Sequence, residues 1–241
     1  MLKQNYINNI IKISSIFLFL LQFSCVQHKK RENIIVASAG KIESLDPAQA
    51  NTLRTLQILS ALGDTLYKLN KEGNLSPNLA SGLPIASKDG LIIDIPLKEN
   101  ISFHDGSIFN AQAMKFSLDR FMKIGTLNYL LNDKIEAIEV KDEFLLRIKL
   151  KKPSSSLKSL LTSVNLTPIS PNSYSNYKDK FNNKSFIGTG PYLLENFSSN
   201  QQIIKPFKNY WGKKPLNKGI NFINYNNSST LFGAIKAKEV D

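Results

Sequence analysis

The stretch that decides the fold runs from Ile101 to Phe121 and reads ISFHDGSIFNAQAMKFSLDRF. Ile101 and Phe103 are apolar at alternate positions and predict the end of a strand, and the pair Asp105-Gly106 predicts a turn. Asn110 is suited to cap a following helix, because its side-chain oxygen can accept from the free N–H groups of the first turn. That helix should bury one apolar stripe, formed by Met114, Leu118 and Phe121.

The same stretch resembles the signature segment of the family 5 extracellular solute-binding proteins, receptors that deliver oligopeptides, dipeptides, nickel or haem to ABC importers. In that family the phrase F-H-D-G-x-x-F-x-A-x-D-V-x-F-S-x-x-R recurs. The residues that match it are Phe103, His104, Asp105, Gly106, Phe109, Ala111, Phe116, Ser117 and Arg120. Ala113-Met114 stands where Asp-Val is usual.

Further phrases extend the resemblance over the chain from about Ile34 to Asp241. They are Leu45-Asp46-Pro47 after the first strand, Gly73 to Ala80 as G-x-x-x-P-x-L-A, Gly188-Thr189-Gly190-Pro191-Tyr192, and Asn209-Tyr210-Trp211-Gly212. The last segment resembles the family's helix and Gly-Glu-x-Asp turn, with Lys238 in place of glycine. Trp211 is expected to pack between domains.

Composition sets limits on the class of protein. The chain has 241 residues, 42% of them hydrophobic, which is enough for one large domain or two small ones. The formal net charge is +12, but the positive residues are scattered singly through apolar patterns. A solvated surface is therefore expected, with no nucleic-acid partner. The single cysteine excludes an intrachain disulfide and a cysteine-based metal cluster.

The first 24 residues have the pattern of a secretory signal peptide. Lys3 and Lys12 precede the apolar run 13–21, which is too short for a comfortable bilayer span. Leu21 to Cys25 resembles a bacterial lipobox, although Gln22 stands where leucine is usual. We expect a lipid on Cys25 to hold the protein at a membrane surface, with residues 25–33 as the tether. The alternative is a signal peptide with an incidental cysteine.

Hydrophobic periodicity predicts the elements outside the signature stretch. Strands are expected at 34–37, buried, and at 91–97, 135–140 and 144–150. Lys88 to Gly90 is a hairpin turn signal, and Pro96 should lie at a sheet edge or near a strand end. A helix is predicted from Thr52, with its apolar spacing at Leu53, Leu56, Leu59 and Gly63.

No catalytic or metal motif stands out. The two histidines are His28 and His104, and His104 alone could serve a triad or a metal site inside the fold. The pair Gly188 and Gly190 lacks the lysine and the following helix of a phosphate loop, so these glycines are expected to allow a tight backbone crossing. We therefore expect no enzyme, no metal site and no cofactor.

The resemblance implies an α/β fold of the periplasmic-binding-protein type II class. A discontinuous mixed-sheet lobe would be formed by residues 34–64 and 166–241, with a β-rich domain inserted at 65–165. Relatives of this family run to about twice this length, so the chain is expected to be an N-terminal part that stops before the second lobe.

The resemblance also implies a function: binding of oligopeptides or dipeptides in the periplasm and delivery to ABC permease subunits, as a monomer. Carried over by position, Ala50, Asn51, Thr52 and Leu53 would offer main-chain groups to the ligand, although each could instead belong to an ordinary helix-capping loop. Gly188 to Tyr192 would lie close to them across a shared crevice.

Two other functions stay open at this point. One is a nickel or haem receptor of the same family. The other is a truncated receptor that acts as an interaction scaffold in the envelope. In either receptor case the chain alone is expected to bind ligand feebly, because one jaw of a closing cleft cannot exclude water from the ligand.

Overall fold

The computed structural model describes residues 32–174 and 185–241. The predicted signal peptide at 1–24, the lipidation site Cys25, most of the tether 25–33 and His28 lie outside those residues. Across the two described ranges, no helix combines the length and hydropathy that a membrane crossing requires.

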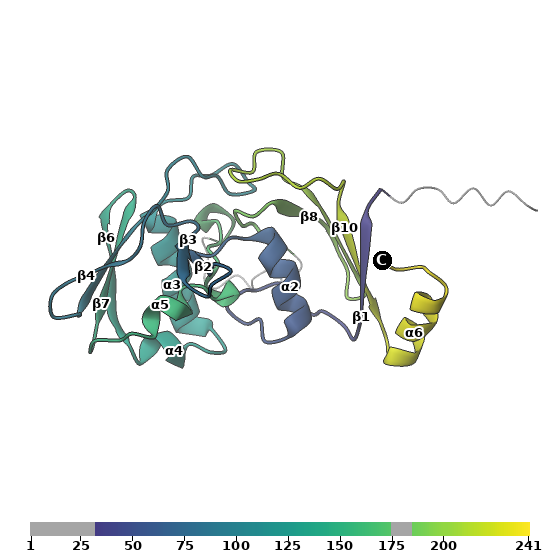
Figure 1. The fold of residues 1–241 in the computed structure, drawn as a ribbon, viewed down its shortest axis with the longest axis horizontal. Helices are drawn as coiled ribbons and strands as arrows, with labels where there is room; N and C mark the ends of the chain where they lie inside the picture. The colour runs from purple at the N-terminus through teal and green to yellow at the C-terminus, as the bar shows by residue number, and fades with distance from the viewer. Residues whose placement is uncertain (1–31, 175–184) are drawn as a thin grey trace, which may run out of the picture. The chain divides into compact units, whose positions relative to one another are not determined.

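The first sheet joins the two ends of the described chain. It contains β1 (Ile34–Ala39), β8 (Tyr192–Phe197), β9 (Gln201–Pro206) and β10 (Ile220–Tyr225), in the order β1-β10-β9-β8. β1 runs parallel to β10 and the other pairs are antiparallel, so the sheet is mixed, as predicted. Helices α2 (Leu53–Leu62) and α6 (Ser228–Lys236) lie on opposite sides of it (Figure 1).

The second sheet is antiparallel and is built from the middle of the chain. Its strands are β4 (Ile85–Ala86), β5 (Ile92–Pro96), β6 (Ile135–Asp142) and β7 (Leu145–Leu150), in the order β4-β5-β7-β6. Side chains alternate between its faces, so that Ile95 and its partner Leu146 are both buried. The long helix α3 (Ala111–Ile124) covers the buried face, in contact with β6 and β7.

Short elements connect these layers. A separate hairpin consists of β2 (Tyr67–Leu69) and β3 (Leu75–Pro77). The remaining short helices are α4 (Tyr129–Asn132), α5 (Leu157–Leu160), and the 3-10 turns η2 (Val164–Leu166) and η3 (Pro171–Ser173).

The buried apolar side chains form two clusters, one for each sheet. The larger includes Phe103, Phe109, Met114, Leu118, Leu146 and Ile148, and the smaller includes Leu45, Ile58, Leu59, Leu62, Phe186 and Ile204. Residues of the signature stretch thus fill the core of the second sheet. The domain boundaries predicted at 34–64, 65–165 and 166–241 stay predictions.

Several local predictions are confirmed. The Asn110 side chain accepts a hydrogen bond from the N–H of Ala113 and caps α3, and the predicted stripe of Met114, Leu118 and Phe121 is buried. The turn at Lys88 to Gly90 joins β4 to β5, with a bond from Gly90 N–H to the Ser87 carbonyl. Pro96 is the last residue of β5, where its missing N–H costs least.

Three predictions are wrong in detail. Ile101 to Phe103 is not a strand end, because Phe103 and Phe109 close the turn through bonds to Ser107 and Ile101, leaving an isolated bridge. In α2 the buried residues are Thr55, Ile58, Leu59 and Leu62, whereas Leu53 is 74% exposed. The first strand is not buried: Ile34 is exposed and the other five residues are half-buried.

Candidate functional site

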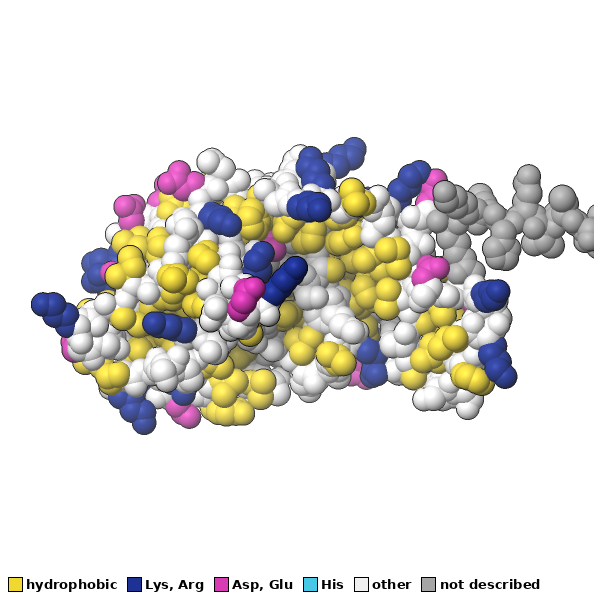
Figure 2. Space-filling model, viewed as in Figure 1, with side chains coloured by type: hydrophobic (Ala, Val, Ile, Leu, Met, Phe, Trp, Pro, Cys, Tyr) yellow, Lys and Arg dark blue, Asp and Glu magenta, His cyan; other side chains and the backbone are white. Residues whose placement is uncertain are grey.

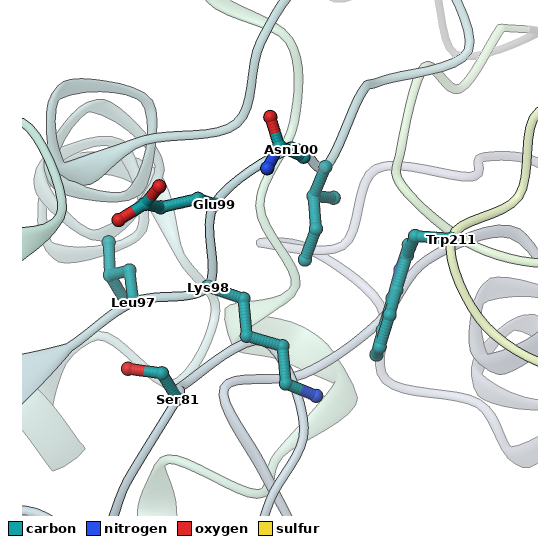
Figure 3. Close-up of a pocket in the computed structure, with 7 residues that line it drawn as sticks. Ser81, Leu97, Lys98, Glu99, Asn100 and Trp211 are labelled. Atoms are coloured by element: carbon teal, nitrogen blue, oxygen red, sulfur yellow. The ribbon is translucent and has the colours of Figure 1, made fainter.

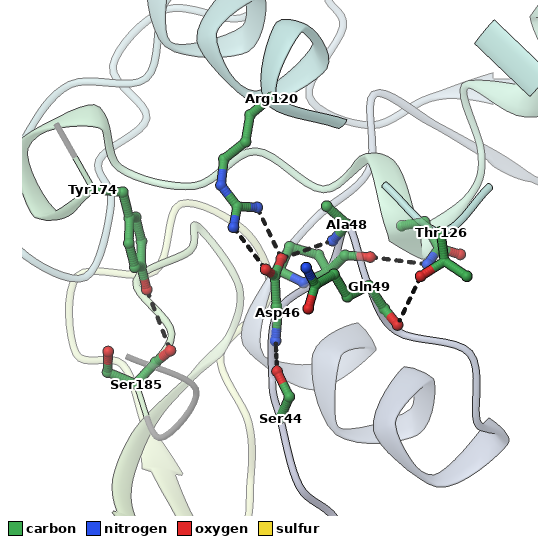
Figure 4. A network of polar contacts seen from close by, with 10 residues as sticks. Ser44, Asp46, Ala48, Gln49, Arg120, Thr126, Tyr174 and Ser185 are labelled. Atoms are coloured by element: carbon green, nitrogen blue, oxygen red, sulfur yellow. Dashed lines mark hydrogen bonds and ion pairs between the residues drawn. The ribbon is translucent and has the colours of Figure 1, made fainter. Parts of the chain in front are cut away.

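The loop that precedes α2 is shaped by Asp46. Its carboxylate oxygen Oδ1 accepts from the N–H of Ala48 at 3.0 Å, and its own N–H donates to the Ser44 hydroxyl at 3.0 Å (Figure 4). This is the local turn that an aspartate before proline favours, since Pro47 fixes its own φ and has no N–H to offer. The Leu45-Asp46-Pro47 phrase is therefore a turn with a buried carboxylate inside it.

Arg120 holds that carboxylate from helix α3. Its Nη1 and Nη2 donate to the two Asp46 oxygens at 2.8 and 2.6 Å, and the residues are only 6% and 1% exposed (Figure 4). A two-pronged guanidinium–carboxylate pair fixes both distance and orientation. Two phrases that are 74 residues apart in the sequence are thereby joined.

The main-chain carbonyls of the loop are satisfied as well. The N–H of Thr126 donates to the Ala48 carbonyl at 3.0 Å. The Asn165 side-chain amide donates to the carbonyls of Pro47 and Ala50, at 2.9 and 2.7 Å. With these bonds the loop is braced from α3, from the turn after α3 and from η2, so it presents the next residues in a fixed position.

The four residues predicted to line the binding cleft follow this brace. Ala50 is buried and both its N–H and its C=O are hydrogen-bonded within the protein. Asn51, Thr52 and Leu53 are exposed, and the Thr52 hydroxyl caps α2 by accepting from the N–H of Thr55. In the part of the chain that the structure describes, no hydrogen bond reaches the main-chain N–H or C=O of Asn51. The Thr52 carbonyl accepts from the N–H of Leu56 at 3.1 Å, so the open main-chain groups are the N–H and C=O of Asn51 and the N–H groups of Thr52 and Leu53, rather than those of Ala50.

His104 connects the turn of the signature stretch, at Phe103 to Ser107, to the segment Gly188 to Tyr192, which we call the glycine loop. Its N–H donates to the Gly188 carbonyl at 2.9 Å, its Nε2 donates to the Gly190 carbonyl at 3.1 Å, and the Gly188 N–H donates to Nδ1 at 3.4 Å. This arrangement requires the neutral ring with its proton on Nε2. Burial lowers the pKa of His104, against smaller opposing effects of the Gly190 hydrogen bond and of Asp105. Both ring nitrogens are occupied by the main chain, so His104 positions the loop.

Asp105, the next residue of the same turn, accepts hydrogen bonds from three serine hydroxyls. Its carboxylate accepts from Ser107, from Ser170 and from Ser173, the last at 2.9 Å. Ser117 of α3 makes a parallel connection, since its hydroxyl accepts from the N–H of Ile169 at 3.0 Å. These side chains of the signature phrase therefore act as clamps on the segment that returns to the first sheet.

Gly190 permits the tight crossing that the sequence predicts. Its N–H donates to the carbonyl of Leu62 at 3.0 Å, and a Cβ at this position would stand 2.4 Å from the Leu62 carbonyl carbon. No side chain fits at that distance. However, Gly188 to Tyr192 does not lie beside Ala50 to Leu53: Gly190 bonds to Leu62 in the last turn of α2, whereas Ala50 to Leu53 stands at the start of that helix, about 15 Å away along its axis. That prediction is wrong.

Asp64 is buried just after the end of α2 and accepts hydrogen bonds from the phrase Asn209 to Gly212. It accepts from the indole N–H of Trp211 at 3.0 Å, from the Tyr210 hydroxyl at 3.2 Å and from the Thr189 hydroxyl at 3.3 Å. Burial raises the pKa of Asp64, and these hydrogen bonds oppose the rise. The Asp64 carboxylate thus connects the end of α2 to Thr189 and to Tyr210 and Trp211.

A pocket of about 520 Å³ lies in front of Trp211 (Figure 3). The residues that line it are Ser81, Leu97, Lys98, Glu99, Asn100, Ile101 and Trp211. The Lys98 ammonium stands 4.4 Å from the centroid of the Trp211 ring, a cation–π contact, and burial lowers the Lys98 pKa. The sequence offered no periodic signal for this pocket, because its walls come from the segment 97–101 and from two residues far from it in the sequence, Ser81 and Trp211.

Within residues 32–174 and 185–241, no three His, Cys, Asp or Glu side chains lie close enough together to hold a metal ion. Polar side chains there are directed mainly at the main chain of the protein itself. What the geometry offers to a ligand is an exposed, braced main-chain segment at 51–53 and the pocket beside Trp211.

Residues 74–241 match the model of the bacterial extracellular solute-binding proteins, family 5 Middle. The chain is 31% identical over 183 residues to the glutathione-binding protein GsiB of Salmonella typhi, which covers 75% of this chain and 35% of that protein. The chain thus spans about a third of the length of the curated relatives that it matches.

Solved structures share the fold. An ABC transporter substrate-binding protein from Sinorhizobium meliloti has a TM-score of 0.76 and 27% identity, covering 87% of this chain and 42% of that one. Listeria monocytogenes OppA bound to peptide has a TM-score of 0.79 and 22% identity, covering 88% and 46%. The predicted fold class is confirmed by these two likenesses, the second of which is one of fold alone.

Proposed function

Because this chain belongs to the bacterial extracellular solute-binding proteins of family 5, we propose that it is the substrate-binding component of an ABC importer, and that its ligands are oligopeptides or dipeptides. It would act outside the cytoplasmic membrane and hand its ligand to the permease without chemical change. The ligand class is supported by the names of similar proteins, one a receptor for glutathione, itself a tripeptide, and one a structure with bound peptide.

One observation carries the proposal: at the end of a braced loop, Asn51 to Leu53 are exposed, and the N–H and C=O of Asn51 and the N–H groups of Thr52 and Leu53 are open. An extended peptide binds a receptor largely through its backbone, which needs free N–H and C=O groups held in place beforehand. The Asp46–Arg120 pair and the Asn165 bonds supply that order before any ligand arrives. Without this order, the entropy lost when the loop became fixed on binding would weaken the affinity for the peptide.

The mechanism that we propose is closure of two lobes over the peptide. Residues 32–241 would form one jaw, with the peptide backbone along Asn51 to Leu53. Ligand contacts made in the closed form alone shift the population toward that form, and the permease would recognise it. Side chains of the peptide would be accommodated by space and water, since the interactions on this jaw are with main-chain atoms.

Amide chemical shifts test the location of the site. The uniformly ¹⁵N-labelled full chain is titrated with a mixed pool of tri- to pentapeptides up to about 10 mM, a range that detects millimolar binding. We expect shifts at the amides of Asn51, Thr52 and Leu53, and none at the Lys88 to Gly90 turn. Shifts confined to other regions, or none at all, would contradict the proposal.

Two substitutions at Asn51 separate main-chain from side-chain recognition. Asn51→Ala keeps the N–H and should leave the peptide-induced shifts unchanged. Asn51→Pro removes the N–H and should abolish them, while circular dichroism and the melting temperature show whether the fold is kept. A loss of binding in Asn51→Ala would assign recognition to the amide side chain instead.

We also propose that Cys25 carries the lipid that holds the receptor at the membrane. The single cysteine of the chain lies directly behind the apolar leader. Metabolic labelling with an alkyne fatty acid should tag the wild-type protein and leave Cys25→Ser untagged. Equal labelling of both, or labelling of neither, would leave export by a plain signal peptide as the explanation.

A further inference from the structure

Arg54, in the first turn of α2, has a guanidinium without an anionic partner. Across residues 32–174 and 185–241, no hydrogen bond or ion pair involves this side chain, and its Nε is buried without an acceptor. A buried donor that bonds to nothing costs free energy, and native structures keep few of them. By contrast, Arg120 and Arg147 each donate two hydrogen bonds to a carboxylate. Arg54 therefore has the capacity to bind an anion.

The guanidinium of Arg54 lies over Gly40, the residue that follows β1. A Cβ at Gly40 would stand 2.7 Å from Nη2 and 3.0 Å from Cζ of Arg54, so a side chain there would displace the guanidinium. Arg54 thus reaches from α2 to the carboxyl end of β1, which runs parallel to β10. The carboxyl ends of parallel strands are where α/β proteins commonly bind ligands.

The main chain beside Arg54 offers further donors. The first N–H groups of a helix have no acceptor within the helix. In the part of the chain that the structure describes, the N–H groups of Asn51, Thr52, Leu53 and Arg54 make no hydrogen bond. The first turn of α2 contains no acidic residue. Open N–H groups and an unpaired guanidinium together favour a negatively charged group of the ligand.

Burial, rather than a basic patch, distinguishes Arg54. On the face that Figure 2 shows, Lys and Arg side chains are spread over the surface. Arg54 is half-buried, and a partly desolvated guanidinium binds a carboxylate more strongly than one in water does. Its planar fork also matches the two oxygens of a carboxylate.

We propose that Arg54 binds a carboxylate of the ligand and so determines specificity beside the main-chain segment Asn51 to Leu53. This assignment, which rests on the proposed function, adds one side chain to the main-chain contacts. The Cα atoms of Asn51 and Arg54 are at most ~11 Å apart, about the length of an extended tripeptide. A peptide along this segment can therefore bring its C-terminal carboxylate, or that of an Asp or Glu side chain, to the guanidinium.

Three matched peptides test the proposal and identify the source of the carboxylate. Ala-Ala-Ala, its C-terminal amide and the amide of Ala-Glu-Ala are titrated into the ¹⁵N-labelled full chain. The amides of Asn51 to Leu53 and the Nε–H of Arg54 report binding. We expect Ala-Ala-Ala to bind about tenfold more tightly than its amide. The same advantage for the Ala-Glu-Ala amide would name a side-chain carboxylate. Equal Kd values for all three peptides would overturn the proposal and leave the proposed function intact.

Sodium acetate separates this site from peptide binding as such. If none of the three peptides shifts any amide of Asn51 to Leu53, the proposed function fails. Acetate should still shift the Nε–H of Arg54, relative to sodium chloride at the same ionic strength. An Arg54 signal that responds to neither acetate nor peptide would exclude the carboxylate site as well.

Two arginine substitutions show whether Arg54 is the group responsible. In Arg54→Met, Ala-Ala-Ala and its amide should bind equally. Arg147→Met should keep the tenfold difference, because Arg147 is already paired with Asp94. Arg54→Lys should keep only part of it, since lysine retains the charge but not the fork. A tenfold difference that persists in Arg54→Met would assign the carboxylate to another group and defeat the proposal.

The melting temperature distinguishes a ligand-binding arginine from one that stabilises the fold. A guanidinium left unpaired in the free protein contributes no ion pair to stability, and methionine can replace the packing of its aliphatic stem. Arg54→Met should therefore leave the melting temperature unchanged or raise it. A clear fall would show that the guanidinium serves the fold, contrary to the proposal.

Discussion

Arg120 and Asp46 show how one pair of side chains can hold two distant parts of a chain. Both charged groups are buried, so the free energy of unfolding depends on each being paired with the other. Arg120→Met leaves the Asp46 carboxylate buried without its counter-charge, and we expect a loss of about 3–5 kcal/mol in the free energy of unfolding, measured by urea denaturation.

Arg147→Met is the matched control for that substitution. Arg147 also makes a two-pronged contact, to Asp94 at 2.7 Å, but both side chains keep more than a fifth of their surface in water. A much smaller loss is expected there, because water screens the pair. Similar losses from Arg120→Met and Arg147→Met would mean that burial does not set the strength of the Asp46 pair.

His104 gives the chain a pH dependence of known sign. Its pKa is lowered by burial from 6.5, so the unfolded chain binds a proton more readily than the folded one. Stability should therefore be full above pH 6.5 and fall as the pH drops below it, by up to about 1.4 kcal/mol per pH unit. Melting temperatures between pH 7.5 and 5.5 measure this effect.

His104→Gln isolates the contribution of this ring. Gln can still donate to the Gly190 carbonyl but does not titrate, so its melting temperature should depend less on pH than that of the wild type. The other titrating groups, including Asp64 with its raised pKa, are common to both proteins. An identical pH dependence in the two proteins would remove His104 as its source.

At the residue scale the sequence indicated which positions matter, and less often what they do. Asn110 could be assigned from local chemistry, because a cap bonds within its own helix turn. The Arg120–Asp46 and Trp211–Asp64 contacts could not, since their partners are 74 and 147 residues apart. The bonds of His104 to the glycine loop could not be predicted either, since Gly188 and Gly190 are 84 and 86 residues away.

At the scale of elements, helix α6 ends in a turn that carries an unfavourable residue. The N–H of Lys238 donates to the Ile235 carbonyl and that of Glu239 to the Ala234 carbonyl, the bond pattern of a Schellman motif. Lys238 has a φ of 57°, the left-handed conformation that glycine adopts without strain. The family resemblance also has glycine at this position.

Lys238→Gly should therefore stabilise the chain, by about 1 kcal/mol, because the left-handed conformation costs a side-chain-bearing residue about that much. Thermal unfolding measures the change. Lys236→Gly, two residues earlier but inside α6, should have the opposite sign, with a loss of about 1 kcal/mol. A loss from Lys238→Gly would show that contacts of the lysine side chain outweigh the backbone strain.

It was easier to predict that a helix or strand forms than to predict which of its sides is buried. In β7, apolar Leu146, Ile148 and Leu150 alternate with Arg147 and Lys149, so its buried side could be read directly from the sequence. The buried side of α2 could not, because its packing partners come from far along the chain. Its buried residues Ile58, Leu59 and Leu62 share one apolar cluster with Ile169, Phe186 and Ile204. Leucines at the helical period are ambiguous when a helix is apolar on most sides.

For the whole molecule, the two clusters of buried side chains and the mixed sheet agree with the fold that the sequence phrases indicate. The sequence did not reveal that β1 would be left uncovered, since an apolar strand predicts burial without saying which segment provides it. It also placed the glycine loop beside Asn51, whereas α2 separates the two. Both failures concern contacts between segments, which periodicity along one segment does not encode.

The last prediction concerns ligand binding by the 241-residue chain as a whole. One jaw of a closing cleft leaves the peptide backbone in contact with water, so we expect a Kd near millimolar at best. At 1 mM peptide, a Kd of about 1 mM stabilises the folded chain by only ~0.4 kcal/mol, which raises the melting temperature by roughly 1–2 °C. A Kd of about 1 μM would give ~4 kcal/mol and a rise of roughly 10 °C. A thermal shift assay with a mixed pool of tri- to pentapeptides separates these cases, with isothermal titration as the check. Micromolar affinity would mean that the braced segment at Asn51 to Leu53 needs no second lobe to exclude water.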